Sequence, residues 1–272
     1  GKDFREAQIK RDNTYIDLKK EQGRLTSSEA NYWKEKTGNL QEYQYGYHKG
    51  WSMILDTLTW PVLIMMIICI GIAPIFAGEY QSKCDSLILC MKYGKSKLIF
   101  AKIVSGWLYA TCVYWGITLI YSSVYMIFLG TQGADLPIQL KYPAMSVGYN
   151  LTMGEAVVIA LLLGYFFTLG IMGITLFMSA LLKNTYAVII VAFLLIIIPT
   201  FLSPDTGGYA WSHVLSLLPP KIADFSFQSY TAYSIGNIVL SWPVMAILIN
   251  AIVAVICSVL GYIVFRKHQV NK

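Results

Sequence analysis

Residues 156–182 read AVVIALLLGYFFTLGIMGITLFMSALL, an apolar run without Asp, Glu, Lys, Arg or His. A helix needs about 20 apolar residues to cross the hydrocarbon core of a bilayer. Backbone groups in lipid must pair within their own segment, so a run of this kind is expected to be helical. The stretch therefore predicts a membrane-spanning helix in the second half of the chain.

Four other stretches lack ionisable side chains in the same way: residues 57–78, 103–130, 184–203 and 236–265. The third of these, with Pro199 near its end, barely reaches across a bilayer. Only 13% of the 272 residues are charged and 56% are hydrophobic, whereas soluble domains carry about 25% charged residues. These figures exclude an ordinary soluble globule and a disordered chain. We expect an all-α polytopic membrane protein with five transmembrane helices.

Lysine and arginine sort the connections between these stretches into two alternating sets. After residue 50, nine of them fall in one set: Lys83, Lys92, Lys95, Lys97, Lys102, Lys183, Arg266, Lys267 and Lys272. Because cytoplasmic loops carry the excess of cations, residues 79–102 and the C-terminus are expected in the cytoplasm. Residues 1–52, 131–155 and 204–235 are then extracytoplasmic, in a protein of the cell membrane.

The first 52 residues are expected to form an extracytoplasmic helical segment. Residues 4–22 predict a charged helix that Gly23 stops, and the capping box from Thr26 to Glu29 opens a second helix through about residue 45. The two predict a helical hairpin, either a solvated spacer or a surface that contacts substrate or a partner. Because the polar start GKDFREAQIK is no signal sequence, we expect one further span upstream and six in the full subunit.

Residues 53–272 form the predicted transmembrane domain, and its outer connection 204–235 is unusual. It carries Gly207-Gly208, Pro219-Pro220 and a short apolar run, and no piece is long enough to span. We expect an outer re-entrant loop of short helices that dip into the outer leaflet. His213 stands alone in this loop, so no metal site is predicted.

Several functional classes are disfavoured by what the spans lack. Ion-coupled transporters place ionisable side chains within the membrane, and these five stretches contain none. No HExxH motif is present, so a membrane metalloprotease is disfavoured too. Gly94-Lys95-Ser96 lacks the earlier glycine of a nucleotide-binding loop, since Leu89 stands there. The sequence predicts no catalytic residue, no cofactor in this chain and no nucleic-acid partner. The energy for any transport is therefore expected to come from a partner protein.

The cytoplasmic connection 75–102 reads IFAGEYQSKCDSLILCMKYGKSKLIFAK. Cys84, Leu87, Ile88 and Met91 recur at helical spacing, which predicts a short amphipathic helix within residues 79–97. Glu79 is expected at its N-terminus, where a carboxylate is favoured. Such a helix lies on the membrane surface or in a groove of a soluble partner. The predicted contact residues are Glu79, Lys83, Asp85, Leu87, Ile88, Met91, Lys95, Lys97 and Lys102.

This connection resembles the signature of the type-2 ATP-binding-cassette (ABC) exporter permeases. In that signature a Glu closes one span, a cytoplasmic helix ends in a turn, and a Lys opens the next span; Glu79 and Lys102 match the first and last elements. The resemblance extends over residues 51–272 in topology, and SLLPP at 216–220 is similar to the family's outer loop. Lys83-Cys84 stands where the family often has Gly-Thr, and the turn lacks the frequent Pro. The long N-terminal segment resembles a subset from Gram-positive bacteria.

The resemblance implies that two permease copies, or this chain and a relative, pair with two cytoplasmic ATPase subunits that bind ATP and Mg. The helix within residues 79–97 would then be the coupling helix. The implied function is export of a hydrophobic or amphiphilic substrate, such as a drug, an antimicrobial peptide or a lipid-like molecule. The alternative is a membrane sensor or immunity subunit that binds peptides through its outer segment without transport.

Polar residues inside the spans predict either a pathway or helix packing. Tyr114, Thr118, Tyr121 and Tyr125 share one helix face, and Asn250 lies near mid-membrane. Hydroxyl groups in lipid require partners, so this face is expected to contact protein or a cavity that an amphiphile crosses. Close-packing faces are predicted by two sets of small residues: Asn250, Ala254 and Ser258, and Gly164, Gly170 and Gly173.

Overall fold

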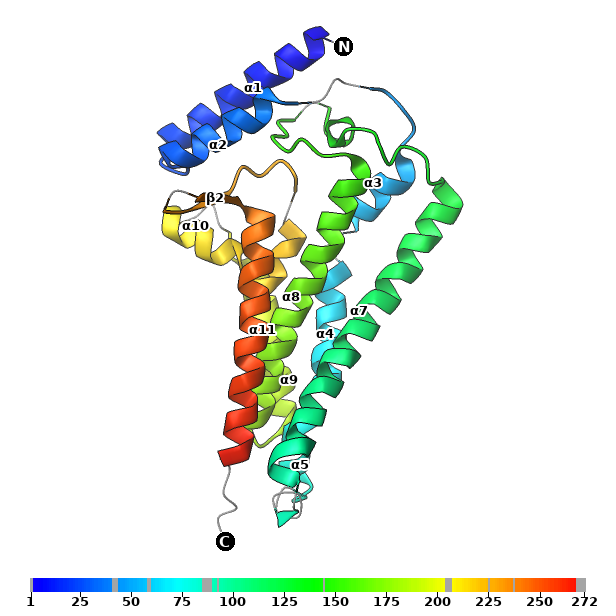
Figure 1. The fold of residues 1–272 in the computed structure, drawn as a ribbon, viewed down its shortest axis with the longest axis vertical. Helices are drawn as coiled ribbons and strands as arrows, with labels where there is room; N and C mark the ends of the chain where they lie inside the picture. Colours follow the sequence, from blue (N-terminus) through cyan, green and yellow to red (C-terminus); the bar gives the residue numbers. More distant parts are fainter. Residues whose placement is uncertain are drawn as a thin grey trace.

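The computed structural model is a bundle of helices with connecting structure gathered at its two ends (Figure 1). It describes residues 2–40, 44–57, 60–84, 90–91, 93–143, 145–203, 207–224, 226–236 and 238–267. The α-helices are α1 (Lys2–Glu21), α2 (Ser27–Gly38), α3 (Lys49–Asp56), α4 (Trp60–Ile72), α5 (Pro74–Gln81), α7 (Ile99–Leu129), α8 (Met153–Leu181), α9 (Thr185–Phe201), α10 (Tyr209–Ser216) and α11 (Trp242–Lys267). Shorter elements are a π-helical turn η1 (Gly94–Leu98), the 3-10 turns η2 (Ile138–Lys141) and η4 (Pro219–Asp224), and the strands β1 (Ala232–Ile235) and β2 (Ile238–Ser241).

Within the described residues, four helices are long and apolar enough to cross a membrane. They are Pro61–Gln81, Ser96–Leu129, Met153–Leu181 and Trp242–Lys267. The fifth predicted span, α9, has 17 residues, which is about 25 Å at 1.5 Å per residue and less than the ~30 Å core. The 31 residues of α7 extend to about 46 Å, and α7 leans away from α8 and α11 (Figure 1). The chain is thus a helical protein with four helices able to cross a membrane.

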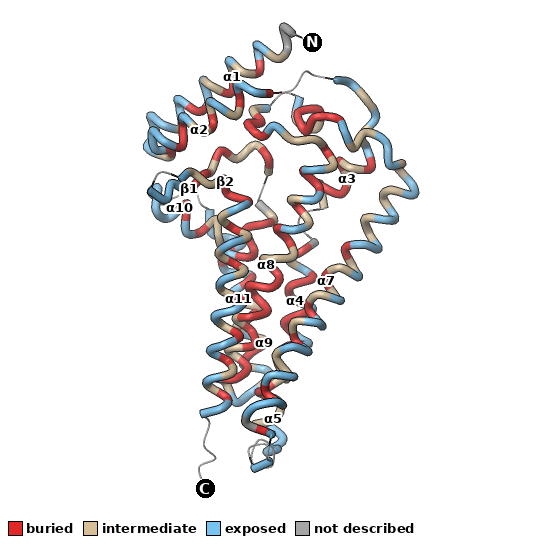
Figure 2. Tube along the Cα trace, viewed as in Figure 1, coloured by how far each residue is buried: buried red, intermediate tan, exposed pale blue. Residues whose placement is uncertain are grey.

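The helix α8 forms the centre of the bundle. It is the most deeply buried of the four long helices and α7 is the least (Figure 2). The helix α11 packs along α8 at Gly170, which faces Asn250, and at Gly173, which faces Ala254. A Cβ atom at Gly173 would lie 2.7 Å from the Cα atom of Ala254, so glycine is required there. The predicted close-packing faces are therefore confirmed.

The two sets of connections lie at opposite ends of the bundle, as their charges predict. The helices α1, α2, α3 and α10 and the strands gather at one end, and α5 and the C-terminus lie at the other (Figure 1). The ring of Phe265 in the last turns of α11 lies 4.7 Å from that of Phe76 in α5. The start of α9 is close by, because Thr185 approaches Gly78. We call these the cap end and the connection end.

The N-terminal helices α1 and α2 pack side by side, which agrees with the predicted helix pair. Gly23 has a φ of 68°, so it ends α1 as expected. The capping box of Thr26 and Glu29 opens α2, which is also confirmed. The predicted extension of α2 to residue 45 is wrong, because the helix ends at Gly38 with Asn39 as its C-cap. The ammonium group of Lys34 lies 2.7 Å from the Asp17 carboxylate and joins the two helices.

The prediction that the last span begins at residue 236 is wrong. The outer connection 204–235 was expected to contain short helices alone, and it also contains a β-strand. Residues 238–241 form β2, which pairs antiparallel with β1, and α11 begins only at Trp242. Gly236 has a φ of 61°, the left-handed conformation that a tight hairpin favours. The expected short helices do occur in this connection as α10 and η4.

The first span is interrupted where Pro74 opens α5. Proline has no N–H group and cannot continue the hydrogen-bond ladder of a helix. The hydroxyl group of Ser179 in α8 compensates: it accepts hydrogen bonds from the backbone N–H groups of Phe76 and Ala77 at 3.0 and 3.1 Å. It also donates to the carbonyl of Ala73 at 2.7 Å. One buried side chain of α8 thus fixes the break between α4 and α5.

We expect the substitution Ser179→Ala to lower the free energy of unfolding by about 1–3 kcal/mol, since it leaves buried backbone groups unpaired. Thermal unfolding in detergent, followed by circular dichroism, measures the loss. The matched control is Ser105→Ala, because Ser105 is exposed and its hydroxyl only donates to Ala101 of its own helix. An equal loss in both variants would show that the hydrogen bonds from Ser179 to the break before α5 do not contribute to stability.

Candidate functional site

An ion pair joins two spans at the connection end. Glu79 lies in the last turn of α5, and its carboxylate accepts a hydrogen bond from the ammonium group of Lys102 in α7. The ammonium group also donates to the carbonyl of Ile75 at 2.9 Å. Both charged side chains are largely buried. A buried pair with a further hydrogen bond holds its partners firmly, so the end of α5 and the start of α7 are tied together.

The helix α5 ends at Gln81, two residues after Glu79. The N–H group of Cys84 donates to the carbonyl of Glu79 at 3.0 Å, and the N–H group of Lys83 donates to that of Tyr80 at 3.2 Å. This pair of bonds is the Schellman motif that ends many helices. Lys83 occupies its left-handed position with a φ of 56°, where glycine is usual. The prediction that Glu79 opens a helix running through Cys84 is therefore wrong.

The other predicted contact residues fall in different places. Met91 is exposed, and Lys95 and Lys97 lie in the π-helical turn η1 just before α7. The ammonium group of Lys97 lies 4.7 Å from the ring centre of Tyr93. Asp85, Leu87 and Ile88 lie outside the described residues. Of the predicted set, the structure brings Glu79 and Lys102 into direct contact.

The candidate pathway residues divide between two interfaces. Tyr114 is fully buried, and its hydroxyl group donates to the carbonyl of Leu161 in α8 at 2.7 Å. Thr118 is buried on the same face of α7, and Tyr121 and Tyr125 pack against the core. Asn250 lies in α11 instead, where its amide donates to the carbonyls of Ala246 and Leu217 at 2.9 and 3.3 Å. These contacts favour the packing interpretation for Tyr114 and Asn250.

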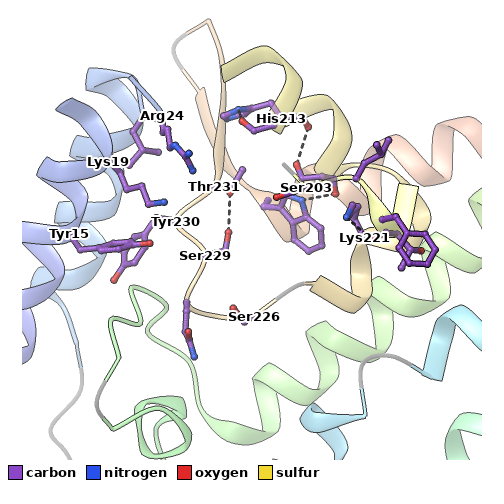
Figure 3. Close-up of a pocket in the computed structure, with 18 residues that line it drawn as sticks. Tyr15, Lys19, Arg24, Ser203, His213, Lys221, Ser226, Ser229, Tyr230 and Thr231 are labelled. Atoms are coloured by element: carbon purple, nitrogen blue, oxygen red, sulfur yellow. Dashed lines mark hydrogen bonds between the residues drawn. The ribbon is translucent and has the colours of Figure 1, made fainter. Parts of the chain in front are cut away.

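A cavity of about 630 Å³ opens at the cap end (Figure 3). Its walls come from α1 and the turn after it, the end of α9, α10, η4, the segment 226–231 before β1 and Trp242 at the start of α11. Three of its side chains are cationic: Lys19, Arg24 and Lys221. Hydroxyl groups add polar lining, and those of Ser229 and Thr231 lie 3.0 Å apart. No acidic side chain belongs to the lining that the structure describes.

The N-terminal helix pair forms one wall of this cavity because aromatic contacts dock it on the bundle. The Trp33 ring is fully buried and lies 4.9 Å from the Tyr149 ring and 5.2 Å from that of Tyr230. The Tyr209 hydroxyl in α10 donates to the Glu29 carboxylate at 2.7 Å. Burial, together with this carboxylate, raises the pKa of Tyr209 to about 12. The docking thus combines buried rings with a charge-assisted hydrogen bond.

A buried carboxyl group lies at the same docking surface. Asp12 in α1 is fully buried. Burial raises the pKa of Asp12 above its ordinary value, and the nearby Ser146 and the Arg11 guanidinium only partly oppose this. Arg11 itself donates to the carbonyl of Met145 at 3.3 Å. Ionisation of Asp12 therefore works against docking.

Sequence reasoning missed the cavity, because its residues come from segments far apart in the chain. His213 lines it, with Nδ1 lying 2.9 Å from the carbonyl oxygen of Tyr209 and Nε2 lying 3.0 Å from that of Ala232. Both ring nitrogens thus lie within hydrogen-bonding distance of backbone carbonyl oxygens. Within the described residues no group of three His, Cys, Asp or Glu side chains is placed to hold a metal ion.

A family model described as "Protein of unknown function (DUF2705)" matches residues 28–270. The chain belongs to the DUF2705 family. The matched range includes all four long helices, the ion pair at the connection end and most of the cavity wall. It begins after α1, so four residues of the cavity lining precede it: Tyr15, Lys19, Arg24 and Leu25. Comparison with curated proteins and with solved structures found no match in either set.

We expect Asp12→Asn to flatten the dependence of stability on pH. The folded-state pKa of Asp12 lies above the ordinary value of 3.8, so the folded protein binds the proton more tightly than the unfolded chain does. The stability that Asp12 contributes is then fully present below pH 3.8, and it is lost as the pH rises through the raised pKa. Melting temperatures in detergent across this window measure the slope. Glu6→Gln, which removes an exposed carboxylate of the same helix, is the control; an unchanged slope in Asp12→Asn contradicts the assignment.

We expect Lys83→Gly to raise the free energy of unfolding by about 1 kcal/mol, since a side chain in the left-handed conformation costs about that much. The matched control is Lys83→Ala, which removes the charge but keeps the Cβ atom and should bring no gain. Thermal unfolding of the three proteins measures the difference. A gain in the alanine variant as large as in the glycine variant would refute the backbone explanation.

Proposed function

We propose that this chain is the transmembrane permease subunit of an ABC exporter. It moves a hydrophobic or amphiphilic compound, and a separate cytoplasmic ATPase subunit hydrolyses the ATP. The observation that carries the proposal is the pairing of Glu79 and Lys102. These two residues match the Glu and the Lys of the permease signature, and they are in contact although 23 positions apart in sequence.

The charge distribution also supports this proposal. The four long helices carry their ionisable groups at the connection end, as Glu79, Lys97, Lys102, Arg266 and Lys267 do, or near the other end, as Glu155 does. Ion-coupled carriers use charged groups inside the membrane, so an external energy source fits this chain better. In this proposal the connection end faces the cytoplasm, in accordance with the excess of cations there. The cap end is extracytoplasmic, and α9 completes a fifth span.

The local geometry supplies a route for coupling. The ATPase subunit acts on the segment between α5 and α7, and the Glu79–Lys102 pair transmits the force to both helices together. The hydroxyl group of Ser179 connects the break at Ala73 and Pro74 to α8, so α5 and α8 are joined as well. Movement then reaches the central helix without any charged group crossing the membrane. Two such subunits, or this chain and a relative, form the complete pathway.

A second candidate function is a membrane sensor or immunity subunit that binds peptides without transport. The observation that favours it is the cavity at the cap end, whose wall includes the N-terminal helix pair. A sensor requires an outer binding site but no ATPase. Partner identity therefore separates the two functions.

Co-purification tests the proposed function directly. The tagged chain is extracted from its native host in mild detergent, and the bound proteins are identified by mass spectrometry. We expect an ABC-type ATPase in near-stoichiometric amount, as well as a second permease subunit. A complex that contains no nucleotide-binding subunit would refute the exporter and favour the sensor.

Charge exchange tests the coupling role of the ion pair. Glu79→Gln and Lys102→Gln should each lower substrate-stimulated ATP hydrolysis about tenfold, within the usual range of coupling between sites. The double variant Glu79→Lys, Lys102→Glu should recover part of it, because the pair forms again in reverse. Lys267→Gln, a cation at the same end in α11, is the control. Full turnover in both single variants would exclude the pair from coupling.

A further inference from the structure

The cap-end cavity concentrates positive charge from three separate segments. Lys19 comes from α1, Arg24 from the turn that follows, and Lys221 from η4. Figure 3 shows Lys19 and Arg24 on one wall and Lys221 on the opposite wall. The ammonium group of Lys19 lies 5.4 Å from the ring centre of Tyr15, which lines the cavity too. An anion between these walls is therefore attracted from both sides.

The position of Lys221 strengthens that attraction. Lys221 is only 3% exposed and lines the cavity, and its ammonium group lies 3.5 Å from the carbonyl oxygen of Thr200, another lining residue. Charges interact more strongly away from bulk water, so a cation at a buried wall acts on an anion more than a surface cation does. Serine side chains make the same wall polar: the hydroxyl groups of Ser212 and Ser216 donate to backbone carbonyls at 2.9 and 3.0 Å, and each can still accept. This lining suits an oxyanion such as a phosphate group.

The cavity also borders the apolar end of a helix. Phe201 and Leu202, where α9 ends, belong to its lining, and Phe201 is 83% exposed. In α10 the apolar Val214 and Trp211 are exposed beside the polar lining residues. A charged chamber next to an exposed apolar rim matches the two halves of an amphiphile. A soluble anion has no apolar part that would contact such a rim.

We propose that the cavity binds the anionic headgroup of an amphiphile whose chains lie along the exposed end of α9 and α10. The volume of about 630 Å³ lies within the ordinary range of small-molecule sites, about 300–1,000 Å³. The identification of an anionic amphiphile as the exported substrate rests on the proposed function. The binding of such a molecule in the cavity does not rest on it.

Calorimetry with short-chain lipids tests the inference. The purified full chain in an uncharged detergent is titrated with dihexanoylphosphatidylglycerol, dihexanoylphosphatidylcholine and glycerol phosphate. We expect saturable binding of the phosphatidylglycerol and at least about tenfold weaker binding of the other two, because one lacks net charge and the other lacks chains.

Two variants locate the site. Lys19→Gln should weaken phosphatidylglycerol binding about tenfold, and adding Arg24→Gln should weaken it further, as expected for hydrogen bonds to charged groups. Both residues are only partly buried, and an unchanged melting temperature verifies folding. The matched control is Lys20→Gln, an exposed cation of the same helix that does not line the cavity. Equal loss in Lys20→Gln would overturn the site.

The remaining outcomes also decide the question. Equal binding of phosphatidylcholine would overturn the anionic headgroup, and equal binding of glycerol phosphate would overturn the amphiphile in favour of a soluble phosphate. Absence of binding would overturn the site altogether. The titration contains no ATPase, so its failure leaves the co-purification result standing. Specific lipid binding by a chain that co-purifies with no ATPase would instead refute only the exporter.

Discussion

The contact between α8 and α11 is so close that a Cβ atom at Gly173 would lie 2.7 Å from the Cα atom of Ala254. Gly170 meets Asn250 along the same line. In lipid, helices gain little from burying apolar surface against each other, so close backbone approach and internal hydrogen bonds must hold them together. Such bonds join α11 to its other neighbours: Trp107 of α7 donates to Ser258 at 3.1 Å, and Asn250 donates to the carbonyl of Leu217 at 3.3 Å. The α8–α11 pair is therefore the rigid part on which the other helices are assembled.

The charged groups lie toward the two ends of the bundle. At the connection end, Glu79 and Lys102 neutralise each other where α5 meets α7. At the cap end, Lys19, Arg24 and Lys221 surround a cavity. Between them the bundle relies on hydroxyl groups, such as those of Tyr114 and Ser179, whose hydrogen bonds go to backbone groups. The chain therefore has two chemically distinct ends connected by an uncharged core.

Much of this arrangement could be predicted because its signals are local. The run 156–182 predicts α8 from length and apolarity alone, and the capping box at Thr26 predicts the start of α2. The strand pair 232–241 could not be predicted, because its apolar residues continue directly into the last span and only pairing makes them strands. The end of α5 could not be predicted either. Lys83 takes the left-handed position that follows this helix, and lysine is not a residue that signals a helix end. The cavity requires six separate segments to meet, and no periodicity within one segment encodes that.

The difference in packing decides which helices can move. Because glycine contacts leave no room between α8 and α11, that pair can only shift as a unit. The helix α7 is the least buried long helix, and it leans away from the bundle toward the cap end. Its start is tied to α5 by Lys102. In the proposed exporter, force on the segment between α5 and α7 therefore changes the spacing between α7 and the α8–α11 pair. No residue of α7 belongs to the described lining of the cavity, so the binding site proposed there does not depend on that spacing.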